Sequence, residues 1–132
     1  NVIGNYIFGL PEDTKDTMKD TLDLANELNC EFSNFYCAMA YPGSALHMQA
    51  RKEGWTLPDS YQAYSQHSYD MLPLATKYIS AREVVEFRDN AFNSHYNRKE
   101  YHDMIRQKFG QETVDEIKDM TKIKLKRKIL GD

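Results

Sequence analysis

Residues 2–9, VIGNYIFG, decide the fold, because this stretch is rich in β-branched and aromatic residues and closes on a glycine. That composition predicts a buried strand. Residues 31–40, EFSNFYCAMA, alternate between two faces and predict a second strand. Between them, Asp13 or Thr14 can cap a helix that Asn29 ends. Two strands joined by a helix of this length form a parallel crossover unit.

The apolar positions of that first helix share one face at helical spacing, namely Met18, Leu22, Ala25 and Leu28. The rest of the chain is predicted to be helical in five segments, 45–52, 61–69, 81–96, 99–109 and 112–129. Ser44, Ser80 with Glu83, and Asn97 with Glu100 supply the predicted start signals. Residues 71–78 contain Pro73 and show no clear periodicity.

The predicted fold class is therefore a mostly helical α/β chain, with one parallel β-α-β unit followed by a C-terminal helical extension. We expect a division into residues 1–54 and 55–132. Asn1 leads straight into the first strand, and two parallel strands would leave two open edges. We therefore expect a piece of a larger α/β protein, whose edges are covered by the remaining strands or by a second copy.

The composition of the chain argues against several functional classes. The 132 residues carry a formal net charge of -3, which gives no basic field for nucleic acid. No apolar run approaches the roughly 20 residues of a membrane span. Cys30 and Cys37 are too few for a disulfide framework and are interpreted as free thiols of a cytoplasmic protein. The four histidines form no i, i+4 pair, so we predict no metal site.

Ligands of parallel α/β proteins bind at the carboxyl ends of the strands, which directs attention to residues 9–14, GLPEDT. Gly9 would let a ligand approach the backbone, and the following helix start offers N–H groups to an anion. In the other interpretation, Gly9 serves the turn, and Asp13 and Thr14 serve the cap.

The second strand ends at residues 40–44, AYPGS. Tyr41 can stack on a flat ring, although an ordinary Pro-Gly turn is equally consistent with the sequence. Parallel neighbours place both carboxyl ends at one rim, so the two loops are expected to converge.

GLPEDT after an apolar strand, about thirty residues before AYPGS, resembles the C-terminal half of radical S-adenosylmethionine (radical SAM) enzymes. The resemblance is strongest to the branch that often carries a cobalamin-binding domain. It implies that the two strands are the last of a partial TIM-type barrel, the (β/α)₆ barrel, and that the parent protein is an iron–sulfur oxidoreductase.

The resemblance assigns cofactor-binding positions residue by residue. Ile7 and Gly9 match the pattern that packs against the adenine of S-adenosylmethionine. Asp13 stands where the family has glutamate, and Tyr41 opens the second matching run. The family glycine after Pro11 is Glu12 here, which departs from the pattern.

The three cysteines that bind the [4Fe–4S] cluster in this family, spaced C-x₃-C-x₂-C, are absent. The resemblance therefore implies no catalytic or metal-binding residue here, and an inactive isolated chain. S-adenosylmethionine and [4Fe–4S] would belong to the parent protein, as would cobalamin where that branch carries it, with no cofactor expected on this chain alone. The alternative function is a helical protein-interaction module attached to a remnant of a nucleotide-binding α/β domain.

Two further features of the sequence have more than one interpretation. Trp55, Tyr61, Tyr64 and Tyr69 could line a substrate opening, although packing is the favoured interpretation. Six basic residues between Lys118 and Lys128 predict a basic C-terminal helix that could meet an acidic partner, RNA or a membrane surface. A solvated helix end is favoured there, because cations suit the helix dipole.

Overall fold

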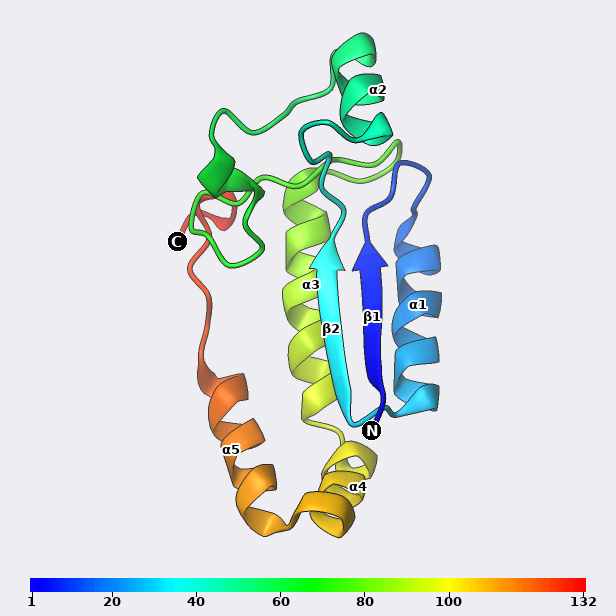
Figure 1. Ribbon diagram of the computed structural model, residues 1–132, viewed down its shortest axis with the longest axis vertical. Coiled ribbons are helices and arrows are strands. Elements are labelled where there is room, and N and C mark those ends of the chain that lie inside the picture. Colours follow the sequence, from blue (N-terminus) through cyan, green and yellow to red (C-terminus); the bar gives the residue numbers. More distant parts are fainter.

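The computed structural model describes all 132 residues and contains two strands, five α-helices and two short 3₁₀ turns. The elements are β1 (Ile3–Phe8), α1 (Lys15–Leu28), β2 (Phe32–Cys37), α2 (Ala45–Glu53), η1 (Tyr61–Tyr64), α3 (Ala81–Tyr96), α4 (Lys99–Phe109), α5 (Gln111–Lys122) and η2 (Lys128–Leu130). β1 and β2 are parallel and pair from Ile3 opposite Phe32 to Phe8 opposite Cys37 (Figure 1). The predicted mostly helical α/β fold with one parallel β-α-β unit is confirmed.

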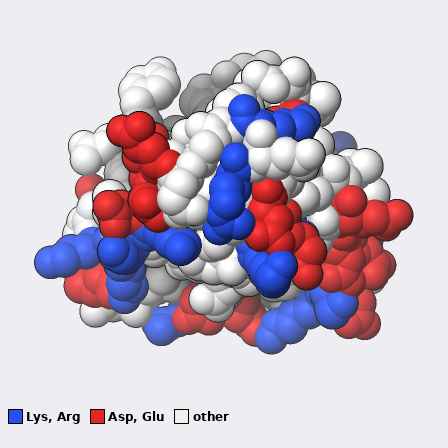
Figure 2. Space-filling view, turned by 90° about the horizontal axis from the view of Figure 1, so that it is seen from below, with Lys and Arg blue, Asp and Glu red and all other residues white.

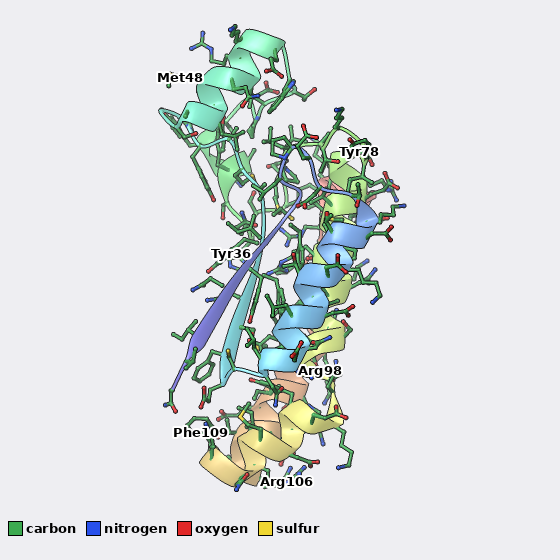
Figure 3. All side chains as sticks on the ribbon, turned by 90° about the vertical axis from the view of Figure 1, so that its right-hand side faces the viewer. Tyr36, Met48, Tyr78, Arg98, Arg106 and Phe109 are labelled. Carbon is green, nitrogen blue, oxygen red and sulfur yellow. The ribbon has the colours of Figure 1, made fainter.

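Helices cover one face of the two-stranded sheet. Side chains alternate along each strand, and Tyr6, Phe8, Phe35 and Cys37 are buried beneath α1 and α3. The side view shows the strands on one side of the molecule and these two helices on the other (Figure 3). One core of 17 buried residues joins the sheet to α1, α3, α4 and α5. The division at residue 54 stays a prediction.

The predicted start signals of α1, α2 and α3 and the predicted end of α1 are confirmed. Thr14 caps α1 in a capping box with Thr17, and Ser80 caps α3 in a capping box with Glu83. Asn29 ends α1 in the left-handed conformation, with φ of 46°. Within the predicted α1 stripe, Met18 and Ala25 are buried, whereas Leu28 is exposed.

The start of α4 differs from the prediction. Asn97 closes α3 instead of opening α4, because its side-chain amide donates to the Asn93 carbonyl at 2.8 Å. Arg98 takes the N-cap position of α4 without a side-chain cap bond. At the other end of α4, Lys108 pairs with Glu31 at the start of β2. This ion pair ties the C-terminal helices to the sheet.

Two predicted helices are shorter than expected. The segment predicted at 61–69 forms only the single turn of η1, because Ala63 alone is buried there and no apolar stripe supports a longer helix. The helix predicted at 112–129 ends at Lys122, and the basic C-terminal helix is therefore wrong. At the end of the molecule formed by α4 and α5, basic and acidic side chains are interspersed (Figure 2).

The C-terminal tail, which follows α5, does not continue the helix because the Arg127 side chain is buried in the protein. Its side chain is fully buried, and its Nη1 donates to the Gln66 carbonyl at 2.7 Å and to the Ser68 carbonyl at 3.2 Å. Its guanidinium also lies 3.5 Å from the Asp89 carboxylate. A buried cation needs such partners, and they lie on a different part of the chain.

The two sheet edges differ, which the sequence did not predict. Side chains cover the free edge of β2. The Tyr96 hydroxyl accepts from the Ser33 N–H at 3.0 Å and donates to its carbonyl at 2.7 Å. Arg88 Nε donates to the Phe35 carbonyl at 2.7 Å. The Gln66 amide bonds both backbone groups of Cys37 at 3.0 Å.

The free edge of β1 has no such cover. The Val2 and Phe8 carbonyls accept from β2, so strand alternation turns the backbone groups of Ile3, Asn5 and Ile7 away from it. No side chain of the molecule donates to or accepts from those outward groups. Another strand can therefore join the sheet only at β1.

No helix of the molecule is both long enough and apolar enough to cross a membrane.

Candidate functional site

The sheet face opposite the helices is open. It carries Ile3, Asn5 and Ile7 from β1, each directly opposite a β2 residue that points the same way, Phe32, Asn34 and Tyr36. Asn34 Nδ2 donates to Asn5 Oδ1 at 3.0 Å, so the centre of the face is an amide pair. Apolar side chains flank this pair at both ends. An apolar surface with a central pair of amides suits a flat, polar heterocycle.

Ile7 is the one predicted site residue that lies on this open face. Its side chain is 49% exposed beside the carboxyl end of β1. Its cross-strand neighbour is Tyr36, which is labelled in Figure 3 on the strand side of the molecule. Tyr36 and Asn34 were missed as site residues. The alternation of 31–40, combined with the parallel register, was the signal that could have found them.

Gly9 serves the packing of α3. It is buried with φ of +84°, and a Cβ at this position would lie 2.5 Å from Val84 Cγ1. Both the left-handed backbone and the close approach of α3 require glycine. The left-handed turn and the packing against α3 therefore account for this glycine, and its predicted role in cofactor binding stays a prediction.

Asp13 is occupied within its own loop. Its Oδ2 accepts from the N–H groups of Gly9 and Leu10, both at 2.9 Å, and its Oδ1 accepts from the Thr17 hydroxyl at 2.8 Å. The carboxylate therefore holds the β1–α1 loop closed, while Thr14 caps the helix. Asp13 keeps the carboxyl end of β1 in place and shapes the rim of the site.

Tyr41 lies on the loop after β2, at the same rim. Tyr41 is 49% exposed, and its ring lies 5.9 Å from the Tyr64 ring, centroid to centroid. Its carbonyl accepts from the Ser44 N–H at 3.0 Å, which makes the predicted turn. The Ala38 N–H donates to the Phe8 carbonyl at 2.8 Å, so the two strand ends stay together up to the loops.

A cleft of about 720 Å³ opens at this rim, between the β1–α1 loop and α2. Trp55 lines it together with Glu12, Glu53 and Lys77. Of the four aromatic residues considered for a substrate opening, the cleft contains Trp55 alone. Lys77 Nζ lies 3.9 Å from Glu12 Oε2, and both side chains are well exposed.

Burial suppresses the nucleophilic and acid–base reactivity of Cys37 and His95 in the core. It raises the pKa of the Cys37 thiol to about 12, so the thiolate nucleophile is not formed at neutral pH. Burial also lowers the pKa of His95 to about 4, with a smaller contribution from the positive charge of Arg98. No group of three or more His, Cys, Asp or Glu side chains is placed to hold a metal ion.

Comparison with known proteins gives one distant match. The chain is 24% identical over 98 residues to a protein of Pyrococcus horikoshii named as an uncharacterized methyltransferase, and the match covers 74% of this chain. The chain spans about a fifth of that relative, 21% of its length. No family model and no solved structure matches the chain.

Proposed function

We propose that this chain is one wall of a larger S-adenosylmethionine-dependent protein of the radical SAM type, contributing the adenine side of the cofactor site. The observation that carries the proposal is the asymmetry of the sheet. Helices cover one face of the sheet, the opposite face is open, and only the β1 edge can accept another strand. This arrangement is expected of a terminal piece of a partial barrel, in which the sheet face without helices lines the interior of the barrel.

The open face suits an adenine ring. Ile7 and Tyr36 offer apolar contact near the carboxyl ends of the strands, and the Asn5–Asn34 pair lies two residues nearer the amino ends on the same face. Such a site binds by packing, with the amides able to hydrogen-bond the edge of the base. Tyr41 would close the rim, while Gly9 and Asp13 keep the strand end and loop in shape.

The chain's own residues do not fit an iron–sulfur cluster, because its two cysteines cannot supply three thiolate ligands. We therefore derive no chemical step from this chain. The name of the distant relative supports methyl transfer and hence a methyl donor of the S-adenosylmethionine kind. Cobalamin has no support beyond the family resemblance.

The alternative, a helical interaction module beside a remnant domain, has less support. α3 shares the core with both strands, and its residues Arg88 and Tyr96 complete the edge of β2. We therefore favour one folded unit that acts as a wall of a larger site.

The first test reads the gene upstream of this segment. The proposal expects C-x₃-C-x₂-C within about 200 residues, on typical domain sizes. The second test measures S-adenosylmethionine binding to the full protein by equilibrium dialysis. Ile7→Asp should weaken binding at least tenfold, because it places a charge on the apolar wall. Leu24→Asp, on the exposed side of α1, is the matched control and should change binding less than twofold.

Unchanged binding in the Ile7→Asp protein, or an upstream region without the cysteine motif, would contradict the proposal.

A further inference from the structure

A second hollow, distant from the open sheet face, lies between α3 and the C-terminal tail. It has a volume of about 570 Å³, within the usual range for small-molecule sites. Apolar side chains from three segments line it: Phe92 from α3, Met120 from α5, and Ile123, Leu125 and Leu130 from the tail. We call this hollow the tail groove.

Arg88 and Asp89 line the tail groove, and together with the buried Arg127 they form a cluster that carries a surplus positive charge. Arg88 and Arg127 share a single carboxylate, Asp89, with Arg88 Nη1 at 2.8 Å and Arg127 Nη2 at 3.5 Å from Asp89 Oδ1. Both arginines are buried, at 7% and 0% exposure. Two buried guanidinium groups against one carboxylate leave one positive charge without a counter-ion, which is costly away from water.

Arg88 also keeps one guanidinium nitrogen free of hydrogen bonds within the protein. Its Nε donates to Phe35 and its Nη1 to Asp89, whereas its Nη2 has no acceptor in the protein. That nitrogen is not among the buried polar atoms that lack a partner, so it retains contact with the surface, and Arg88 lines the tail groove. The charged side chains at the rim are already balanced, since Glu86 pairs with Arg82, and Lys124 with Asp132.

We propose that the tail groove binds an aliphatic carboxylate, a medium-chain fatty acid being the simplest example. The apolar lining would take the hydrocarbon chain, and the free donor of Arg88 would take the carboxylate. A single surplus charge matches a monoanion, and one free guanidinium nitrogen suits a single-point contact better than a dianionic phosphate.

The experiment titrates the chain with decanoate, decanol and decyltrimethylammonium below their micellar concentrations, using isothermal calorimetry. Decanoate should bind at least tenfold tighter than decanol, and the cation should bind weakest. Methyl resonances of Met120 and Ile123 should shift with decanoate, which locates the site. Absence of saturable decanoate binding, or affinities for decanoate and decanol within twofold of each other, would overturn the proposal.

Variants at the rim test the charge directly without touching the buried network. Ile123 is 70% exposed, so Ile123→Glu should fold normally. It should weaken decanoate binding at least fivefold more than decanol binding, because both ligands lose the apolar contact and only decanoate meets the new negative charge. Glu86→Gln removes a rim anion and should tighten decanoate binding two- to threefold. Leu24→Glu, at a 50% exposed position of α1, is the matched control and should leave decanoate affinity unchanged. An Ile123→Glu protein that binds decanoate like wild type would contradict the proposal.

Discussion

Acidification from pH 7 to pH 5 should destabilise this protein mainly through one buried imidazole. His95 is fully buried, and its Nδ1 lies 2.8 Å from Asn26 Oδ1. The rings of Phe35, Tyr96 and Tyr101 surround it, and Arg98 is the charged group that lowers its pKa alongside burial. No carboxylate contributes to the shift, so protonation is opposed by both burial and charge.

The sign and size of this pH effect follow from the linkage between proton binding and folding. The folded-state pKa of His95 is lowered to about 4, against an ordinary value of 6.5. The stabilisation is therefore fully present above pH 6.5 and is lost as the pH falls through 6.5 towards 4. Between pH 7 and pH 5 the free energy of unfolding should fall by about 2 kcal/mol from this group alone.

Urea denaturation at the two pH values measures this difference, and His95→Phe is the control variant. Phenylalanine keeps an aromatic ring in the same surroundings but cannot take a proton. The pKa values of Glu31 and Glu83 are lowered from an ordinary 4.5 to about 2, so their stabilisation is lost mainly below pH 5. The variant should therefore lose less than about 0.5 kcal/mol between pH 7 and pH 5. Equal losses in the variant and the wild type would refute the assignment to His95.

Three further substitutions test the packing. Gly9→Ala should lower the free energy of unfolding by about 3 kcal/mol, because the alanine would take a left-handed φ and its Cβ would clash with Val84. Urea denaturation measures this loss. Adding Val84→Ala should recover part of it. Arg127→Met should lower the free energy of unfolding by about 3 kcal/mol and make the C-terminal tail the first site of limited proteolysis, because it removes the guanidinium that bonds the Gln66 and Ser68 carbonyls and holds the tail to Asp89. Tyr96→Phe should cost about 2 kcal/mol in urea denaturation by removing both hydrogen bonds to the β2 edge; a loss under about 0.5 kcal/mol would show that water replaces the hydroxyl.

Features set by neighbouring residues were predictable from the sequence. The Ser80–Glu83 capping box and the left-handed Asn29 use contacts within four residues, and both were found at the predicted positions. The parallel pairing of the two strands also follows from local patterns and from the length of the helix between them.

Features set by distant partners were not predictable. The basic run that contains Arg127 is typical of a solvated helix end. Arg127 is buried because it contacts Gln66 and Asp89, which are far away in the sequence. Likewise, the close approach of Val84 to Gly9 could not be predicted, because the two residues are far apart in the sequence. In the candidate site, Ile7 was predicted, whereas Tyr36 needed the register of the strand pair.

The closure of the β2 edge has a consequence for self-association. A strand pair with two free edges can add copies at both sides and grow into a fibril. Here Gln66, Arg88 and Tyr96 saturate all the outward groups of Ser33 and Cys37, and one of the two on Phe35. Edge pairing through β1 therefore ends after a single partner strand, and growth by repeated addition of identical copies is blocked.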